Sequence, residues 1–367
     1  IIYYNNLMIT EQNLLTKKAI ELLQKLIATP SFSSEEDMSA QHLESWFKEF
    51  DIPYKRVNNN VYAFNKYFDK EKPNLLLNSH HDTVKPNEAY SRDPFEPHIV
   101  DGKLFGLGSN DAGGCLVSLI ATFTFFYESK NLNHNIIIAA TAEEESSGNK
   151  GLNSLLTILP EIDVAIVGEP TLMNLAIAEK GLVVFDATVH GTPSHAAHPN
   201  SNNAIYNTIE VLEWFKNYKF PKISEVLGEV KLTVTQIKAG SQHNVVPAKV
   251  NMVIDVRVND RYNNKEIAEI LSNEAPCELK PRSLRLNSSC IDKNHPLVIS
   301  GIALGRSSYG SPTLSDQAAL SCPSLKLGPG DSTRSHSADE FIFIEEIEGA
   351  IDLYIKILNG FLNKKEL

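Results

Sequence analysis

The chain has 367 residues, of which 42% are hydrophobic, and its formal net charge is −11. This length is typical of two or three domains with cores large enough to exclude water from a site. Lys and Arg are scattered among an excess of acidic residues, which argues against binding to nucleic acid or to an anionic membrane. No segment has the roughly 20 apolar residues that span a bilayer. We therefore expect small molecules or peptides as partners.

The four cysteines form no closely spaced pair of the kind that binds structural zinc. Four cysteines in so long a chain are also too few for a disulfide framework, so we expect a reducing cytoplasm. Residues 1–7 lack the basic start and apolar core of a secretory signal. The chain begins with Ile, and we expect Met8 to be the natural first residue.

Helical and strand patterns alternate in the first half of the chain. Apolar residues at helical spacing over 15–27 predict a first helix. Ser33 and Glu36 have the spacing of a capping box for a second helix that ends near Phe50. A third helix is predicted over 116–126. Short apolar runs predict strands buried on both faces, typical of an α/β sheet, at 75–77, 136–140 and 164–167.

The pattern changes at Gly181 and predicts a smaller α+β unit inserted into the first domain. Its longer strands are predicted at 182–190, 230–237 and 250–258, and its helices at 204–215 and 265–272. The sheet pattern returns at 323–328, and a final helix with one apolar face is predicted over 345–362. Both chain ends therefore close the first domain, with boundaries at 1–180, 181–290 and 291–367.

Three adjacent carboxylates, Glu143, Glu144 and Glu145, follow the predicted strand at 136–140. Adjacent like charges repel one another, and they become favourable when a strong cation lies among them. The acidic first turn of a solvated helix is the alternative interpretation. Similar groups elsewhere in the chain favour a metal.

Those groups also follow buried strands or lie in glycine-rich segments. His80 directly follows a strand, and Asp82 comes two residues later. Because ligands gather at the carboxyl ends of strands in α/β sheets, His80 is a candidate metal ligand oriented by Asp82. Asp111 lies in a glycine-rich segment, Glu169 follows another strand, and His336 follows a second glycine-rich segment. Each of these motifs alone also suits a surface turn.

In their order along nearly the whole chain, these motifs resemble the family of dinuclear zinc hydrolases that includes acetylornithine deacetylase, succinyl-diaminopimelate desuccinylase, aminoacylase and carboxypeptidase-like enzymes. The resemblance implies two zinc ions bridged by Asp111. His80 and Glu169 would hold the first ion. Glu145 and His336 would hold the second. Cobalt and manganese also suit this set of imidazole and carboxylate ligands.

The resemblance also implies a mechanism and a fold. Glu144 matches the general base, which takes a proton from a water activated between the ions and later gives it to the departing amine. Asp82 matches the acid that orients His80, and a cis peptide bond is implied after Asp111. The implied fold is a zinc-peptidase-like catalytic domain, with a mostly parallel sheet flanked by helices, and an inserted ferredoxin-like α+β lid and dimerisation domain.

Residues of the inserted unit match family positions that meet the substrate. His195 matches a histidine that reaches from one subunit into the site of the other to stabilise an oxyanion, which implies a homodimer. Asn244 and Arg257 match substrate contacts, and a guanidinium group pairs with a carboxylate in two-point fashion. Lys180, at the domain junction, is a further candidate for the same task. Without the resemblance, these residues suit surface loops and a strand-end salt bridge.

Several positions depart from the family pattern. Ser79 stands where glycine usually precedes the first metal histidine, Glu143 where an aspartate is common, and Ala112-Gly113 where Met-Lys is frequent. None of these changes removes a ligand. The loop at 312–316 resembles the desuccinylase Gly-Thr-Ser-Asp loop, but it has Leu314 in place of the threonine. This difference argues against diaminopimelate as the substrate amine.

We therefore expect an enzyme of arginine biosynthesis that removes an acetyl or succinyl group from a basic or neutral α-amino acid such as ornithine or citrulline. A dipeptidase, aminopeptidase or carboxypeptidase with the same ions is the alternative enzyme, and a free α-amine on the substrate separates an aminopeptidase or dipeptidase from a deacylase. A binding protein that keeps the fold without the reaction is the alternative of another class. Loss of a ligand or of Glu144 would be its signature, and all are present.

Overall fold

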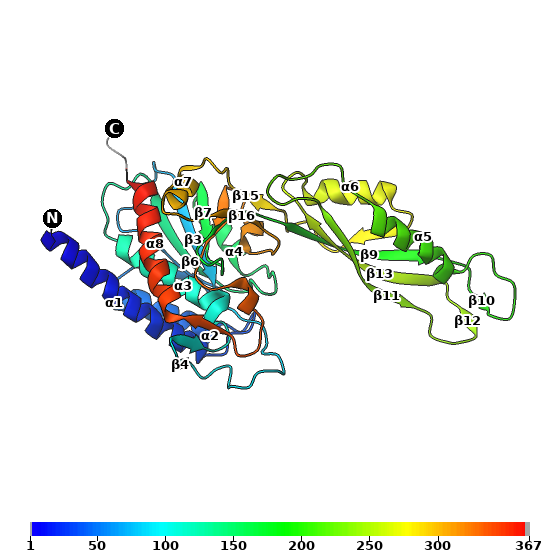
Figure 1. Cartoon of the computed structure of the whole chain (residues 1–367), viewed down its shortest axis with the longest axis horizontal. Coiled ribbons are helices and arrows are strands. Elements are labelled where there is room, and N and C mark those ends of the chain that lie inside the picture. Colours follow the sequence, from blue (N-terminus) through cyan, green and yellow to red (C-terminus); the bar gives the residue numbers. More distant parts are fainter. Residues whose placement is uncertain (1, 364–367) are drawn as a thin grey trace. The chain divides into compact units, whose positions relative to one another are not determined.

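A computed structural model describes the backbone of residues 2–363 and the side chains of residues 10–363. The chain forms two compact units (Figure 1). Ala178–Cys290 and Gly310–Leu314 make up the second unit, and the rest of the described chain makes up the first. Residues 310–314, which the sequence places in the first unit, belong to the second, where the N–H of Lys180 donates to the carbonyl of Ser311 at 3.2 Å. Residues 2–7, before the expected start at Met8, belong to the first helix, and Ile1 lies outside the described residues.

The first unit is built on a sheet with the strand order β1-β2-β6-β3-β7-β17-β8. These strands are β1 (Tyr54–Val57), β2 (Asn60–Phe64), β3 (Asn74–His80), β6 (Asn135–Thr141), β7 (Val164–Val167), β8 (Leu175–Glu179) and β17 (Ser324–Lys326). The central strands β6, β3, β7 and β17 are parallel to their neighbours in this group. Their carboxyl ends therefore lie along one edge, and the predicted α/β sheet is confirmed.

Alternate residues of the central strands enter two different cores, because successive side chains of a strand point to opposite faces. Leu75 and Leu77 of β3 pack in the larger core, whereas Leu76 packs in the smaller one. The larger core also contains apolar residues of α1 (Ile2–Ile27), α2 (Asp37–Glu49), α3 (Gly114–Phe126), α7 (Pro296–Ala303) and α8 (Ile344–Leu362). The short helix α4 (Leu152–Leu156) covers the other face. The sheet is thus buried on both sides, as its apolar runs predict.

The predicted capping box of the second helix is wrong. α2 begins after Glu36, whose side chain makes no cap hydrogen bond, and the Ser33 hydroxyl instead donates to Asp82 Oδ2 at 2.7 Å. The Glu36 carboxylate accepts the backbone N–H groups of Ser34 at 2.6 Å and Glu143 at 3.2 Å. The bonds to Asp82 and Glu143 therefore tie the start of α2 to distant segments near the candidate ligands, in place of a capping box.

The second unit has a four-stranded antiparallel sheet in the order β11-β13-β9-β14 (Figure 1). Its strands are β9 (Gly181–His190), β11 (Lys231–Ala239), β13 (Lys249–Val258) and β14 (Glu278–Pro281). Apolar side chains of α5 (Ala204–Asn217) and α6 (Asn264–Glu274) pack against one face of this sheet. β10 (Ser194–His195) pairs with β12 (Val245–Val246) separately. The predicted strands and helices of the inserted unit are confirmed.

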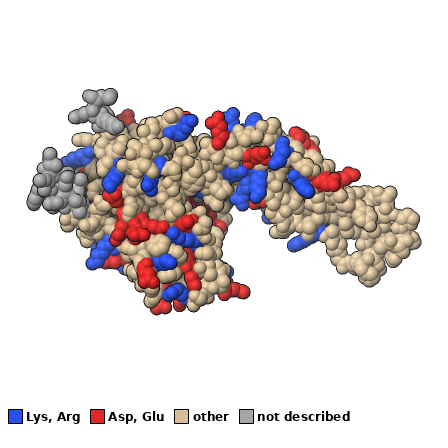
Figure 2. Space-filling model, viewed as in Figure 1, with Lys and Arg blue, Asp and Glu red and all other residues tan. Residues whose placement is uncertain are grey.

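Short elements complete the fold. β4 (His98–Val100), β5 (Lys103–Phe105) and β18 (Phe341–Phe343) form a small separate sheet. β15 (Ser289–Cys290) and β16 (Ser308–Ser311) lie in segments that connect the units along the chain. In the described part of the chain, no helix has the length and apolar character needed to cross a membrane. Figure 2 shows acidic and basic side chains interspersed on the visible face of the first unit.

Candidate metal centre

The predicted ligands meet at the carboxyl edge of the parallel strands. His80 is the last residue of β3, while Glu145 and Glu169 lie in the loops that follow β6 and β7. His336 follows the short turn η3 (Ser332–Arg334), which comes after β17. Asp111 lies in the irregular turn η1 (Ser109–Gly113) that leads into α3. The peptide bond between Asp111 and Ala112 is cis, as the resemblance implies.

Two sets of side chains face each other across Asp111. His80 Nε2 lies 3.4 Å from Asp111 Oδ1 and 3.8 Å from Glu169 Oε1. His336 Nε2 lies 3.1 Å from both carboxylate oxygens of Glu145 and 3.7 Å from Asp111 Oδ2. In each set, the possible ligand atoms lie within 4.8 Å of one another. Asp111 therefore presents one oxygen to each histidine.

The chemistry of this donor set fits two divalent cations. His80 is 1% exposed, and its Nε2 is buried without a hydrogen-bond partner. Leaving a buried polar atom unpaired costs about 1–3 kcal/mol, so such an atom calls for a ligand. Imidazole nitrogens and carboxylate oxygens without a thiolate suit zinc, cobalt or manganese. The shared Asp111 suits a pair of ions rather than one.

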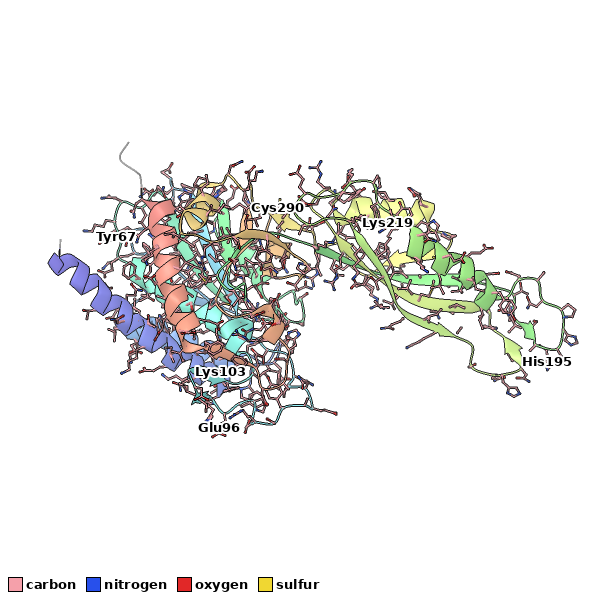
Figure 3. The ribbon with its side chains drawn as sticks, in the orientation of Figure 1. Tyr67, Glu96, Lys103, His195, Lys219 and Cys290 are labelled. Carbon is pink, nitrogen blue, oxygen red and sulfur yellow. The ribbon has the colours of Figure 1, made fainter. Side chains whose placement is uncertain are left out.

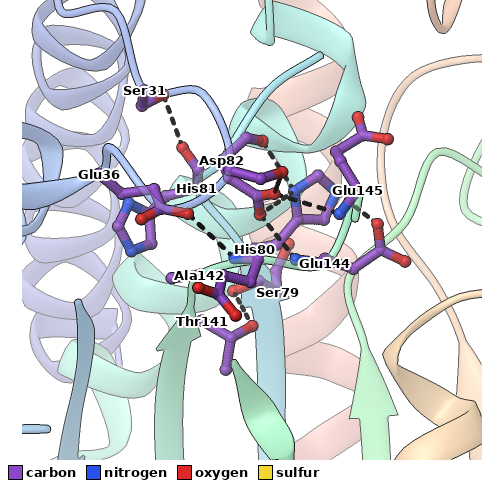
Figure 4. A network of polar contacts seen from close by, with 12 residues as sticks. Ser31, Glu36, Ser79, His80, His81, Asp82, Thr141, Ala142, Glu144 and Glu145 are labelled. Carbon is purple, nitrogen blue, oxygen red and sulfur yellow. Dashed lines mark hydrogen bonds and ion pairs between the residues drawn. The ribbon is translucent and has the colours of Figure 1, made fainter. Parts of the chain in front are cut away.

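Asp82 connects His80 to the acidic loop after β6 (Figure 4). Its Oδ1 lies 3.3 Å from His80 Nδ1 and accepts the backbone N–H of Glu144 at 3.0 Å. Its Oδ2 accepts the backbone N–H of Glu145 at 3.1 Å. His80 Nδ1 also lies 2.9 Å from the backbone oxygen of Asp82. With a metal ion on Nε2, the ring would be neutral and its proton would lie on Nδ1, which faces these two acceptors.

The pKa values of the clustered groups reflect an excess of negative charge. Burial raises the pKa of Glu144 well above its usual value, and the charge of Glu169 acts in the same direction. Burial and the charge of Asp111 raise the pKa of Glu169 to about 8. The hydrogen bond to Glu145 raises the pKa of His336 to about 9. In the ion-free protein, these groups therefore keep protons that offset the clustered negative charge. Bound cations would offset the same charge.

Two further acidic residues, which no sequence pattern indicates, shape this site. Asp316 Oδ2 accepts the side-chain N–H of Asn78 at 2.9 Å and the hydroxyl of Thr141 at 2.8 Å, which joins the ends of β3 and β6. Glu340 accepts backbone N–H groups around Asp111. Asp316 lies in the loop at 312–316, and Glu340 lies four residues after His336, but no sequence pattern indicates partners so far away along the chain.

His195 lies on β10 at the tip of the second unit (Figure 3). It is exposed, and its Nδ1 accepts the backbone N–H of Ala197 at 3.1 Å. A neutral ring in this position therefore carries its proton on Nε2 and has a free donor there.

The three predicted substrate contacts also lie in the second unit. Arg257 forms a two-point ion pair with Asp255, with N–O distances of 2.9 and 3.1 Å. Lys180 Nζ donates to the backbone oxygen of Glu229 at 2.7 Å. Asn244 has an exposed side chain, and its backbone oxygen accepts an N–H from the loop after β10. Their contacts with a substrate stay predictions.

The clustered ligands define a candidate site for divalent metal ions, and the family match and the relatives given next identify the chain as a metal-dependent amidohydrolase. Residues 76–360 match the sequence profile of peptidase family M20/M25/M40, and the chain belongs to this family. The predicted architecture of a catalytic domain with an inserted dimerisation-type domain is confirmed.

Relatives and solved structures extend over most of the chain. The succinyl-diaminopimelate desuccinylase of Wolbachia pipientis wMel is 26% identical to this chain over an alignment that covers 94% of this chain and 93% of the relative. The enzyme of that name from Rickettsia bellii (strain OSU 85-389) is 25% identical over an alignment that covers 93% of this chain and 96% of the relative. The Bacillus subtilis YXEP protein, a dinuclear metal binding peptidase from the M20 family, shares the fold with a TM-score of 0.73 and 16% sequence identity. The match covers 95% of this chain and 98% of that protein. A tripeptidase of Staphylococcus aureus has a TM-score of 0.72 and 19% sequence identity, and the match covers 94% of this chain and 97% of the tripeptidase.

Proposed function

We propose that this protein hydrolyses the amide bond of an N-acyl α-amino acid with the help of two divalent metal ions, most simply zinc. The observation that carries the proposal is the pair of ligand sets that share Asp111. His80 and Glu169 would hold one ion. Glu145 and His336 would hold the other. The description of a structural neighbour as a dinuclear metal binding peptidase supports two ions rather than one.

Two divalent ions in this site would acidify a water molecule and polarise the carbonyl of the amide. Glu144 would act as the general base, and its Oε2 lies 4.0 Å from His80 Nε2. Burial raises the pKa of Glu144 in the ion-free protein, and it would oppose the lowering of that pKa by two nearby cations. This balance suits a group that accepts a proton near neutral pH and then delivers it to the amine nitrogen. His195 would donate its Nε2–H to the oxygen that becomes negatively charged, since its Nδ1 already accepts an N–H.

The proposed acyl group is acetyl or succinyl, and the proposed amino acid is basic or neutral, such as ornithine or citrulline, in arginine biosynthesis. The names of the relatives support an N-succinyl amide as the bond that is cleaved. Leu314, in place of the threonine of the desuccinylase loop, argues against diaminopimelate as the amine. Arg257, Asn244 and Lys180 are the proposed partners of the substrate carboxylate.

The proposed active form is a homodimer. β11 forms an edge of the sheet of the second unit, and edge strands pair readily with another strand. Apolar side chains on α5 are also exposed, among them Tyr206 at 70% and Ile209 at 57%. An exposed edge and an exposed apolar helix face in one unit support an interface with a second copy.

None of the four cysteines, all in the described part of the chain, forms a disulfide, which supports the cytoplasm as the compartment.

The proposal is tested by incubating purified protein with N-acetyl and N-succinyl derivatives of ornithine and citrulline, with N-succinyl-diaminopimelate, and with a set of dipeptides. Each substrate is assayed with and without a chelator, and release of the free amine is measured. We expect release from an acylated ornithine or citrulline, abolished by the chelator. Release from the dipeptides alone would favour a peptidase, and no release from any compound by metal-loaded protein would contradict the proposal.

A further inference from the structure

The Glu340 carboxylate lies beneath the turn that carries Asp111. Glu340 is 1% exposed. Its Oε1 accepts the backbone N–H groups of Asn110 at 2.8 Å and Asp111 at 2.9 Å, and its Oε2 accepts that of Gly108 at 3.2 Å. The backbone oxygen of Glu340 also accepts the N–H of Gly106 at 2.9 Å. Three oxygens of one residue thus accept four backbone N–H groups from a stretch of six residues that is distant along the chain.

The turn needs these acceptors because its backbone is irregular. Asp111 has φ −119° and ψ 97°, which is not helical, so regular helical bonds do not satisfy the N–H groups near it. Gly108 has a φ of +75°, and a Cβ at this position would lie 2.5 Å from Thr83 Cγ2. The bonds to Glu340 therefore hold the backbone of Asp111 in a conformation that helix geometry does not impose.

Glu340 and His336 belong to the same segment of chain. The side chain of Asn110, next to Asp111, both donates a hydrogen bond to the beginning of this segment and accepts one from it. Its Nδ2 donates to the backbone oxygen of Asp331 at 3.1 Å, and its Oδ1 accepts the N–H of Asp331 at 3.1 Å. The segment 331–340 therefore carries His336 and is hydrogen-bonded to the Asp111 turn at both ends of the segment, through Asp331 and through Glu340. Asp111 Oδ2 and His336 Nε2, 3.7 Å apart, are held in register by these contacts.

We propose that Glu340 is a positioning residue that sets the spacing between Asp111 and His336, and thereby the affinity for the ion that these two side chains would share with Glu145. This inference rests on the proposed metal-dependent function. Residues that orient metal ligands typically change metal affinity about 10- to 100-fold when they are replaced. Glu340 acts through backbone N–H groups, so its effect reaches the ion without any contact with substrate.

The test compares Glu340→Gln and Glu340→Asp with the wild type in a Co²⁺ titration followed by absorption, together with kcat and KM. Gln keeps one oxygen in place for Asn110 and Asp111 but turns an NH₂ group toward Gly108, whereas Asp is too short to reach the turn. We expect one of the two binding steps to weaken about 10-fold in Glu340→Gln and more in Glu340→Asp. We also expect kcat to fall at nearly constant KM.

Asp339→Asn is a matched control. The Asp339 carboxylate also accepts backbone N–H groups, from Ser91 and Arg92, but it does not bond to the Asp111 turn. We expect the two Co²⁺ affinities and the kcat of this variant to stay within about twofold of the wild type. The hydrogen bonds of Asp339 do not hold any of the proposed metal ligands in place.

The outcomes separate this inference from the proposed function. A wild type that binds no Co²⁺ would contradict the metal centre itself. A wild type that binds two ions, beside folded Glu340 variants with unchanged affinity for both, would overturn the role of Glu340 alone. Should both variants fail to fold, hydrogen exchange on the metal-loaded wild type decides: the N–H groups of Gly108, Asn110 and Asp111 are expected to exchange slowly, and fast exchange at all three would overturn the inference.

Discussion

The Asp82 carboxylate accepts the backbone N–H of Glu144 at 3.0 Å, and the same oxygen lies 3.3 Å from His80 Nδ1. One buried acid therefore orients a proposed metal ligand and holds the loop of the proposed general base. The two functions that the resemblance assigns to separate motifs are connected by a single side chain. Replacement of Asp82 is expected to disturb both.

We expect Asp82→Asn to lower metal affinity about 10- to 100-fold and to lower kcat as well. An amide has only one acceptor oxygen, so the N–H of Glu144 or of Glu145 would face an NH₂ group and lose its bond. Isothermal titration with Zn²⁺ and steady-state assays measure the two effects. Asp292→Asn is a suitable control, because the Asp292 carboxylate accepts a local N–H from Asn294. Equal metal affinity in Asp82→Asn and the wild type would disprove the orienting role.

Glu144→Gln is expected to keep both ions and to lose about 10²- to 10⁴-fold in kcat, since it removes the proton acceptor without removing a ligand. Metal analysis and turnover of the same preparation test this. Glu143→Gln serves as the control, because the Glu143 carboxylate bonds to the Ser34 hydroxyl at 2.8 Å and the Lys150 N–H at 3.0 Å instead. That variant is expected to lose stability rather than turnover. Unchanged turnover in Glu144→Gln would rule out its role as the base.

His195→Ala is expected to lower kcat about 10²- to 10³-fold, the usual effect of removing one donor to an oxyanion. His198→Ala is the control, because the two rings are neighbours with centroids 5.8 Å apart. A similar loss in both variants would point to damage to the loop rather than to a lost donor.

Mixing two inactive variants tests whether His195 acts in the partner subunit's site. Subunits with His195→Ala and subunits with Glu144→Gln are refolded together. If the site is shared in a homodimer, half of the dimers are mixed and each has one intact site, so about a quarter of the wild-type activity returns. If His195 serves the site of its own chain, every site keeps a defect and the mixture stays inactive.

Thermal stability of the metal-free protein is expected to fall as the pH rises from 6 to 9. The pKa of Glu169 is raised to about 8 and that of His336 to about 9, above their ordinary values of 4.5 and 6.5. A raised pKa in the folded state contributes stability that is complete below the ordinary pKa and is lost as the pH rises through the raised one. Bound divalent ions replace the lost protons, so Tm of the metal-loaded protein is expected to change little over this range. Differential scanning fluorimetry at several pH values, with chelator and with Zn²⁺, measures both; parallel curves would contradict the prediction.

The sequence predicted the central strands well, because residues such as Ile136 to Ala140 are apolar in an unbroken run and have no alternative but burial. It also predicted the places of the candidate ligands, since parallel strands bring their carboxyl ends to one edge. The capping box at Ser33 failed for a physical reason. The Ser33 hydroxyl finds the buried carboxylate of Asp82, and no local rule anticipates a partner 49 residues away.

Glu340 and Asp316 escaped prediction for a related reason. The side chain of Glu340 bonds to backbone N–H groups, which every residue except proline has, so no sequence pattern identifies its partners. Asp316 Oδ2 bonds to Asn78 and Thr141, whose side chains lie inside strands that otherwise appear apolar. Such contacts depend on the assembled fold, whereas the strands depend on local composition.

The central claim is that five side chains from distant segments hold two divalent ions. Its most direct test is a crystal of the zinc-loaded protein measured at the zinc absorption edge. Two anomalous peaks are expected on either side of the Asp111 carboxylate, one contacted by His80 and Glu169 and the other by Glu145 and His336. Zinc-loaded crystals without any peak at these residues, or with peaks only elsewhere, would contradict the account.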